Sequence, residues 1–343
     1  MIGWWLLPVV VALSCLLTGL LRRYALHKQI IDVPNARSSH VVPTPRGGGL
    51  SIVLTFLACL PVLGVLAVVD SAVLLGIGGS GALIAVIGFM DDHGHIAARW
   101  RLLGHFAAAL WLLLWLGGLP PLLVVGYELD LHWIGAVLTA FYCVWMLNLY
   151  NFMDGIDGLA SIEAITVCLS MALLAGLTGL SSLLVLPLIL AAAAAGFLFW
   201  NFPPAKIFMG DAGSGFLGIV LAGLSLQAAW QSSALFWCWL IMLGVFVVDA
   251  TLTLMRRLLR GDKVYEAHRS HAYQFASRHY ARHLPVTLAV GALNLFWLLP
   301  IALCVALLGL DGALGVLIAY VPLVLLAARW GAGTLERPSD LRT

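Results

Sequence analysis

Charged residues are scarce in this chain, and their scarcity excludes a soluble globular fold. Asp, Glu, Lys and Arg make up 10% of the 343 residues, whereas apolar residues make up 62%. A soluble domain carries about 25% charged residues. A soluble fold of this length has too little interior to bury so much apolar surface. We therefore expect an integral membrane protein.

Cysteine pairs and runs of basic residues are missing as well. The six cysteines lie inside apolar stretches and none forms a CxxC pair, which argues against a zinc or redox site. The Lys and Arg residues are spread over several short segments, so we expect no binding to nucleic acid. The first apolar stretch lacks a basic n-region and a small-residue cleavage site, so we expect a retained helix there.

Long apolar runs dominate what remains, and each run of about 20 residues is long enough to cross a bilayer as a helix. The sequence contains eleven of them, near 3–21, 50–69, 72–90, 103–119, 132–150, 159–178, 182–200, 213–231, 234–255, 286–308 and 311–329. Ten spans is the alternative, because some runs are separated by very short loops. We predict an all-α, polytopic transmembrane bundle that forms a single domain over 1–343, with 256–285 as its long cytoplasmic loop.

The basic residues indicate the orientation of this bundle. Eleven spans place all eighteen Lys and Arg residues on one side, which the positive-inside rule makes cytoplasmic. The N-terminus is then outside and the C-terminus inside, and the basic segments face anionic membrane lipid. Nine of the ten histidines lie on the same side. We therefore expect the chemistry at the cytoplasmic face of the membrane.

Two adjacent carboxylates, Asp91 and Asp92, end the third apolar run in GFMDDHGHI. Neighbouring residues do not share a helix face, so the two are expected to contact different partners. Such a pair raises the pKa of one member, which suits a general base near neutral pH. The alternative interpretation is a solvated helix end that only helps to fix the topology.

A second polar motif, NLYNFMDGIDGLA, occupies 148–160. Asn151, Asp154 and Asp157 are three residues apart, and on a helix they would form one stripe directed at one site. The glycines beside them leave room for a ligand to approach the backbone. The alternative is a loop with aspartate caps and glycine turns.

The third motif, NFPPAKIFMGDAGSGFLG at 201–218, contains a glycine-rich turn before an apolar run. Free N–H groups at a helix N-terminus suit phosphate. Asp211 would repel phosphate unless a cation lay between them, so the motif predicts a divalent ion that bridges to a pyrophosphate. Oxygen ligands and phosphate favour Mg²⁺ over zinc. The alternative is an N-cap aspartate on a packed glycine face.

Two basic segments could contact phosphate. Arg46 lies in DVPNARSSHVVPTPRGGG and could clamp an anion. The alternative is that this segment is only a loop of turn residues on the positive side of the membrane. The motif HRSH contains His268, Arg269 and His271, and without a third ligand a zinc site is disfavoured. An amphipathic helix on the membrane surface is the alternative there. Glu163 and Asp249 are interpreted as buried structural carboxylates.

The ordered motifs MDD, NFMDGIDGLA, NFPPAKIFMGDAGSG and HRSH resemble those of the polyprenyl-phosphate N-acetylhexosamine-1-phosphate transferases, glycosyltransferase family 4. These proteins are relatives of phospho-N-acetylmuramoyl-pentapeptide transferase. The resemblance covers residues 32–275. It implies ten or eleven transmembrane helices, a Mg²⁺ ion (with Mn²⁺ as a substitute), and transfer of a phospho-sugar from a UDP-sugar to undecaprenyl phosphate with release of UMP.

The resemblance also implies roles for individual residues. Asp211 would be the principal metal ligand, with Asn151 near the metal. Asp91 would deprotonate the lipid phosphate, supported by Asp92. The remaining residues would bind the donor: Asp154, Asp157, Asn201 and Phe208 on the nucleotide side, and His268, Arg269 and His271 near the diphosphate or sugar. Apart from the resemblance, the chemistry of the loops makes Arg46 and Gly210 further candidates for substrate binding. We prefer direct attack of the lipid phosphate on the β-phosphorus, and a two-step route through an aspartyl-phosphate stays open.

Two departures from the pentapeptide branch bear on the sugar. That branch has a triple-His run where this chain has HRSH, and a lysine where this chain has His40. Both favour a smaller UDP-N-acetylamino sugar, such as the N-acetylglucosamine, N-acetylfucosamine or N-acetylquinovosamine derivative. Sugars of this kind begin O-antigen or related surface polysaccharides. The sequence leaves the oligomeric state open, with a homodimer among the options.

A secondary transporter and a non-catalytic membrane scaffold are the two alternative classes of protein. A secondary transporter also has many spans and intramembrane carboxylates, but it places them near the bilayer midplane and often shows inverted repeats. Here the motifs gather at one face and no repeat is found. A membrane scaffold would not need both the Asn/Asp motif and the FMGD turn.

Overall fold

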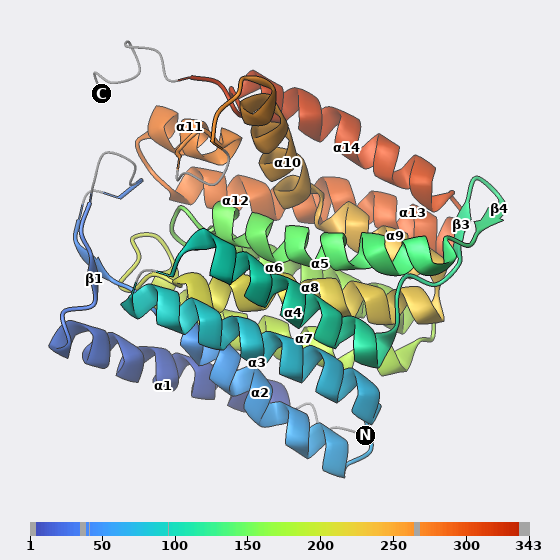
Figure 1. Ribbon diagram of the computed structural model, residues 1–343, viewed down its shortest axis with the longest axis horizontal. Helices are drawn as coiled ribbons and strands as arrows, with labels where there is room; N and C mark the ends of the chain where they lie inside the picture. The colour runs from blue at the N-terminus through green and yellow to red at the C-terminus, as the bar shows by residue number, and fades with distance from the viewer. Residues whose placement is uncertain (1–4, 35–38, 41, 95, 264–267, 336–343) are drawn as a thin grey trace.

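The structure, a computed structural model, describes residues 5–34, 39–40, 42–94, 96–263 and 268–335. It is a bundle of long helices with two very short antiparallel sheets (Figure 1). The helices follow the apolar runs, since a segment in lipid must satisfy its own backbone hydrogen bonds. Every predicted run is helical over most of its length.

The helices fall into two sequential groups. The first comprises α1 (Leu6–His27), α2 (Leu50–Val65), α3 (Ser71–His93), α4 (Ala98–Leu116), α5 (His132–Met153), α6 (Leu159–Leu177) and α7 (Val185–Asn201). The second comprises α8 (Asp211–Gln231), α9 (Ser233–Met242), α10 (Gly244–Leu259), α11 (Ala272–Tyr280), α12 (Leu284–Leu293), α13 (Leu299–Leu308) and α14 (Gly312–Arg329). A 3₁₀ turn, η1 (Ser181–Leu183), precedes α7, and a π-helical turn, η2 (Asn294–Leu298), joins α12 to α13.

Eight of the helices in the described part of the chain are long and apolar enough to cross a membrane, or nine if α9 and α10 form one span. The segment α12–η2–α13 counts as one of the eight. With 16 residues, α2 is too short to be one of the eight, and α4 is not among them either. The chain is thus a multi-pass membrane protein whose described part contains eight or nine helices that are able to span a membrane.

Three features differ from the prediction. The run 234–255 is not one straight helix, because α9 and α10 meet at an angle of 65°. The polar segment 256–285 is not simply a loop, since it contains α11. The chain is also not purely α-helical: β1 (Ile31–Asp32) pairs with β2 (Thr44–Pro45), and β3 (Leu122–Val124) pairs with β4 (Tyr127–Leu129). Such short strands leave no signal in the hydropathy pattern.

Helix α8 forms the centre of the bundle and is buried along its apolar length. Its glycines allow close approach of its neighbours, as is common between membrane helices. A Cβ on Gly218 would lie 2.5 Å from Cα of Leu147 in α5, and a Cβ on Gly88 in α3 would lie 2.5 Å from the backbone nitrogen of Ala212. This packing brings the ends of α3 and α5 beside the start of α8.

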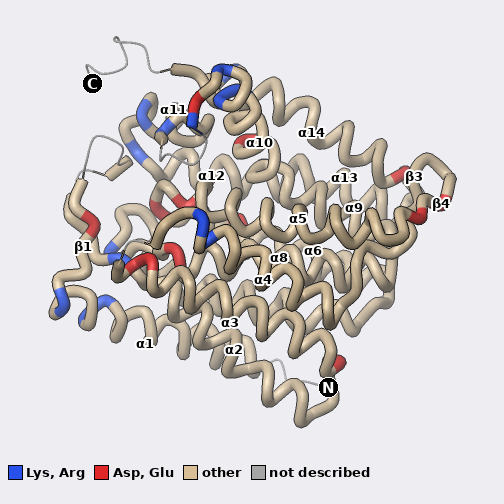
Figure 2. Tube along the Cα trace, viewed as in Figure 1, with Lys and Arg blue, Asp and Glu red and all other residues tan. Residues whose placement is uncertain are grey.

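The charged residues are distributed unequally between the two ends of the bundle. Figure 2 shows Lys and Arg gathered at the end that carries β1 and α11, and no Lys or Arg at the end that carries β3 and β4, within the described ranges. The ends of α3 and α5 and the start of α8 lie at the basic end. The polar motifs of the sequence are therefore brought to one end of the molecule.

Candidate functional site

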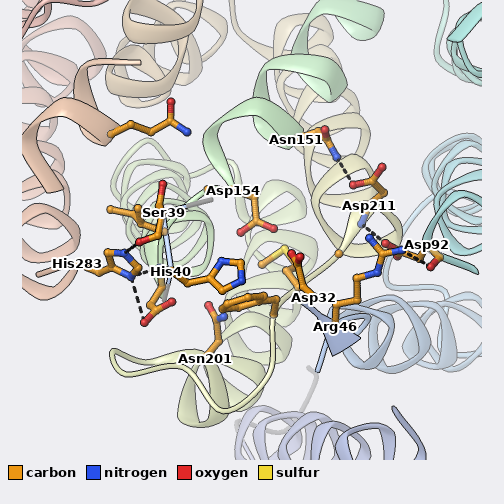
Figure 3. Close-up of a pocket in the computed structure, with 17 residues that line it drawn as sticks. Asp32, Ser39, His40, Arg46, Asp92, Asn151, Asp154, Asn201, Asp211 and His283 are labelled. Carbon is orange, nitrogen blue, oxygen red and sulfur yellow. Dashed lines mark hydrogen bonds and ion pairs between the residues drawn. The ribbon is translucent and has the colours of Figure 1, made fainter. Parts of the chain in front are cut away.

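A polar cavity of about 280 Å³ lies where α3 and α5 end and α8 begins (Figure 3). Nine of the site residues that the sequence predicts line this cavity, namely Arg46, Asp92, Asn151, Asp154, Asp157, Asn201, Phe208, Gly210 and Asp211. Asp91, His268, Arg269 and His271 are not in its wall. Residues far apart in the chain thus meet at one site, although four of those predicted lie outside the wall.

Asp211 is the first residue of α8 and follows Gly210, whose positive φ of 79° favours glycine. The Asp211 carboxylate accepts a hydrogen bond from Asn151, with Nδ2 and Oδ1 3.0 Å apart. The same amide nitrogen donates to Oγ of Ser214 at 3.0 Å. The last turn of α5 and the first turn of α8 are therefore joined through side chains at the cavity.

Asp92 caps α8 from a neighbouring helix. Its carboxylate accepts from the backbone N–H groups of Asp211, at 3.2 Å, and Ala212, at 3.3 Å. A carboxylate is favourable at this position because the first N–H groups of a helix lack intrahelical partners and carry a partial positive charge. Arg46 in turn donates to the backbone oxygen of Asp92 at 2.6 Å. Asp92 thereby positions the turn that presents Asp211.

Asp91 points to different partners, as its adjacency to Asp92 predicts. Its carboxylate accepts from the backbone N–H of Ile96 at 2.8 Å and lies 2.5 Å from Nη1 of Arg101. The same Arg101 nitrogen lies 3.6 Å from the Asp211 carboxylate. Arg101 was not predicted as a site residue; it was counted only among the basic residues that indicate the orientation. Its spacing from Asp91 gave a weak signal, because the contact requires the turn between α3 and α4.

Asn151, Asp154 and Asp157 do not form a helix stripe, which corrects the prediction. Helix α5 ends at Met153, so Asp154 is its C-cap and Asp157 lies in the loop before α6. The side chains nevertheless converge, because the loop folds back across the end of the bundle. In Figure 3 the Asp154 carboxylate lies between the Asn151–Asp211 pair and His283.

Asn201 and Phe208 complete the opposite wall. The Asn201 amide accepts from the backbone N–H of Gly158 and donates to the backbone oxygen of Ile207, both at 3.0 Å. It thus ties the loop after α5 to the turn before α8. The ring of His40 meets Phe208 edge to face, with centroids 4.7 Å apart, and so brings the α1–α2 segment to the cavity.

The HRSH residues lie beside a buried carboxylate instead of in the cavity wall. Nδ1 of His271 is 3.4 Å from Oδ1 of Asp249, and its ring stacks on His268 with centroids 4.9 Å apart. Burial, then the charges of His271 and Arg257, lower the pKa of His268 to about 3. Asp249 also accepts from the backbone N–H of Ala272, at 2.9 Å, so this cluster anchors the start of α11.

Eight cavity residues were not among the predicted site residues, namely Asp32, Ser39, His40, Gly155, Ile156, Met209, Gln274 and His283. Gln274 comes from α11, and His283 directly precedes α12. Their positions depend on how the α11–α12 pair packs against the bundle, so residue spacing carried no signal for them. Glu163 is fully buried as expected and accepts from Nδ2 of Asn294 at 2.7 Å.

The electrostatics of the cavity suit a cation. Burial, followed by the charges of Asp211, Asp92 and Asp157, raises the pKa of Asp154 well above that of an exposed aspartate. No group of three His, Cys, Asp or Glu residues in the described ranges could hold a metal ion alone. Mg²⁺ typically binds one or two carboxylates and completes its shell with water and substrate phosphates. The oxygen donors here fit such an ion when it is shared with a phosphate ligand.

An apolar groove of about 680 Å³ adjoins this cavity, lined by residues of α10, α11, α12, η2 and α14. Neighbouring residues of the chain line the two spaces: Tyr273 lines the groove and Gln274 the cavity, while Met153 lines the groove and Asp154 the cavity. The Tyr273 hydroxyl donates to the backbone oxygen of Phe152 at 2.9 Å and holds α11 against the end of α5. A polar cavity therefore lies beside an apolar groove.

Comparisons with known proteins agree with this geometry. The sequence profile described as glycosyl transferase family 4 matches residues 74–229. The chain is 33% identical over 268 residues to a probable undecaprenyl-phosphate N-acetylglucosaminyl 1-phosphate transferase of Bacillus subtilis, with 75% of this chain and 72% of the relative covered. It is 32% identical over 291 residues to a decaprenyl-phosphate N-acetylglucosaminephosphotransferase of Mycobacterium leprae, with 75% and 72% covered.

A shorter similarity links the chain to a phospho-N-acetylmuramoyl-pentapeptide-transferase of Moorella thermoacetica. The two are 34% identical over 157 residues, which cover 42% of this chain and 49% of the relative.

Proposed function

The chain belongs to glycosyl transferase family 4, and we propose that it transfers a sugar 1-phosphate from a UDP-N-acetylamino sugar to undecaprenyl phosphate, with release of UMP. One observation carries the proposal: a carboxylate-rich polar cavity lies beside an apolar groove. A nucleotide-sugar is soluble and anionic, whereas a polyprenyl phosphate is anchored in lipid. Adjoining polar and apolar spaces accommodate both kinds of substrate.

Asp211, with Asn151 beside it, would hold Mg²⁺ against the donor diphosphate, and Mn²⁺ could replace it. Bound there, the ion would supply charge neutralisation between two anionic substrates and at the leaving group. Asp92 contributes by fixing the α8 turn on which Asp211 sits. The raised pKa of Asp154 supports the proposal, because it reflects burial of the carboxylate and then the negative charges of Asp211, Asp92 and Asp157 around it.

The reaction we favour is direct. An oxygen of the lipid phosphate bonds to the β-phosphorus of the donor, the bond from that phosphorus to the bridging oxygen breaks, and UMP leaves. Asp91 would accept the proton of the lipid phosphate when the phosphate is monoprotonated. Its ion pair with Arg101 keeps the carboxylate near Asp211 before the acceptor arrives. Arg46, which already contacts Asp92, would then orient phosphate oxygens.

The sugar is proposed to be a small N-acetylamino sugar. The relatives named for N-acetylglucosamine align over 75% of this chain, whereas three pentapeptide transferases align over 42%, 35% and 62% of it. The chain also has HRSH in place of a triple-His run. Both observations support a first step in O-antigen or related surface polysaccharide assembly.

The location is proposed to be a bacterial inner membrane, with the cavity at the cytoplasmic face. The Lys and Arg residues gather at the cavity end (Figure 2), and this asymmetry marks a cytoplasmic side. Counting α2, α4 and the α9–α10 pair as spans would give eleven, with the N-terminus outside.

The test uses purified protein with undecaprenyl phosphate, Mg²⁺ and a panel of UDP-N-acetylamino sugars, and it follows UMP release. We expect release that requires the lipid, stops with a chelator and is lost in Asp211→Asn. The matched control is Asp130→Asn, an identical change beside His132 and outside the cavity wall. If well-folded wild-type protein releases no UMP with any donor, the proposed reaction is wrong.

A further inference from the structure

His283 joins two segments of the cavity wall that are far apart in the sequence. Its Nδ1 lies 3.1 Å from Oδ2 of Asp157, and its Nε2 lies 3.0 Å from the backbone oxygen of Ser39. Asp157 belongs to the loop between α5 and α6, and Ser39 belongs to the segment between α1 and α2. Figure 3 shows both contacts at one side of the cavity.

The partners of His283 indicate which form of the ring the site holds. A carbonyl oxygen and a carboxylate oxygen are both acceptors, so both ring nitrogens donate when the ring is a cation. The backbone N–H of Asp157 is also 3.3 Å from Nδ1, but the carboxylate is nearer and charged. The side chains of His283 and Asp157 are only 16% and 12% exposed, so this ion pair is shielded from solvent.

Asp157 is held in place from three directions. Besides His283, its carboxylate accepts from the backbone N–H of Ala205 at 3.0 Å, and its backbone oxygen accepts from the Thr287 hydroxyl at 2.8 Å. The α12 side of this arrangement contributes both His283 and Thr287. The position of Asp157 in the wall therefore depends on how the start of α12 is seated.

Ser39 lies next to His40, whose ring packs on Phe208 in the wall. Holding the Ser39 carbonyl therefore also holds His40 and Phe208 together. In addition, a cation beside Asp157 offsets one of several carboxylates that an anionic donor meets, the others in the wall being Asp32, Asp92, Asp154 and Asp211. His283 thus acts on both the shape and the charge of this side of the cavity.

We propose that His283 is a positioning residue for the nucleotide-sugar donor, which clamps the Ser39 carbonyl to Asp157 and so holds this part of the cavity wall in place. The inference rests on the proposed function, since it names a determinant of donor binding at that site. His283 does not need to touch the reacting atoms. Its loss is therefore expected to weaken donor binding and to leave the chemical step nearly intact.

The experiment compares two near-isosteric variants that each retain one contact. His283→Asn keeps a donor near the Nδ1 position and Asp157, whereas His283→Gln keeps one near the Nε2 position and Ser39. With UDP-N-acetylglucosamine, or the panel member that the wild type prefers, each should raise the donor KM on the order of tenfold, the loss of one charge-assisted hydrogen bond. The KM for undecaprenyl phosphate and kcat should change by less than about threefold.

His279→Gln is the matched control, because His279 lies on α11 against Trp330 and outside the cavity wall. A second readout needs no turnover: UMP should raise the melting temperature of the wild type and of His279→Gln more than that of either His283 variant. If one His283 variant fails to fold, the other carries the comparison.

The outcomes separate the two proposals. An inactive wild type contradicts the proposed function. An active wild type with an unchanged donor KM and an unchanged UMP shift in a folded His283 variant contradicts the clamp alone. A loss of kcat with both KM values unchanged would also contradict it, because His283 would then act in the chemical step.

Discussion

Individual carboxylates in this protein differ in function because their neighbours differ. Asp92 caps the N-terminus of α8, and Asp91 forms an ion pair with Arg101. Asp157 forms an ion pair with His283 and accepts a hydrogen bond from a backbone N–H. Burial, and then the charges of the neighbouring carboxylates, raise the pKa of Asp154. Residues of one type within one cavity can therefore serve as cap, ion-pair partner and candidate ligand.

The His283–Asp157 pair gives stability a defined pH dependence. Burial opposes the protonation of His283, but the hydrogen bond and charge of Asp157 outweigh burial and raise its pKa above the ordinary 6.5. A group with a raised folded-state pKa contributes stability fully below its unfolded pKa and loses that contribution as pH rises through the folded pKa. The pair should therefore stabilise the fold most in mildly acidic solution.

The measurement is the melting temperature of wild type and Asp157→Asn in detergent, from about pH 5.5 to about pH 8.5. The wild type should be the more stable at the acidic end, and the difference should shrink as pH rises. Asp130→Asn, which alters an exposed pair with His132, is the control for removing a carboxylate. A difference that grows with pH would contradict the assignment of the charged ring to His283.

At the scale of elements, the contact between α3 and α8 determines the site. Gly88 lets the two helices touch: a Cβ there would lie 2.5 Å from the nitrogen of Ala212 and 2.6 Å from the carbonyl carbon of Asp211, which are backbone atoms that cannot move independently. The same contact brings Asp92 to the N-terminus of α8. Helix packing and the placement of Asp211 are thus one structural feature.

Gly88→Ala should therefore lower both stability and activity. Overpacking of a close contact costs about 1–3 kcal/mol, and separation of α3 from α8 would pull Asp92 away from the turn that holds Asp211. The matched control is Gly176→Ala in α6, where the nearest atom would be 3.8 Å away, an ordinary contact. Its stability should stay within about 1 kcal/mol of wild type. Thermal melting and UMP release measure both effects, and equal behaviour of the two variants would contradict this account.

At the scale of the whole molecule, the charge asymmetry predicts the orientation. The basic residues gather at the cavity end, and the β3–β4 hairpin lies at the other (Figures 1 and 2). By the positive-inside rule the cavity end is expected to be cytoplasmic. A cysteine placed at Gly126, in the hairpin turn where a side chain would meet open space, should react with a membrane-impermeant maleimide in intact spheroplasts.

The companion variant is Gly261→Cys, after α10 at the basic end, where a side chain also meets open space. It should react only after the membrane is permeabilised. Glycine at both positions has a positive φ, so the two substitutions carry similar local strain. The reverse labelling pattern would place the cavity outside and contradict the proposed location.

The sequence alone determined the membrane class, the positions of the helices and the segregation of charge to one end. These follow from local properties, because a helix in lipid must be apolar over its own length and must satisfy its own backbone hydrogen bonds. The motifs around Asp92, Asn151 and Asp211 were also visible, since polar residues at the ends of apolar runs are costly without a partner.

Only the tertiary structure decided which partner each of these residues has. The capping of α8 by Asp92, the contact of Arg101 with Asp91 and the link from His283 to Asp157 join residues 10 to 126 positions apart. The HRSH residues lie beside Asp249, and the bend between α9 and α10 interrupts a continuous apolar run. Such contacts depend on how helices pack against one another. A hydropathy profile describes each segment separately, so it gives no information about packing between segments.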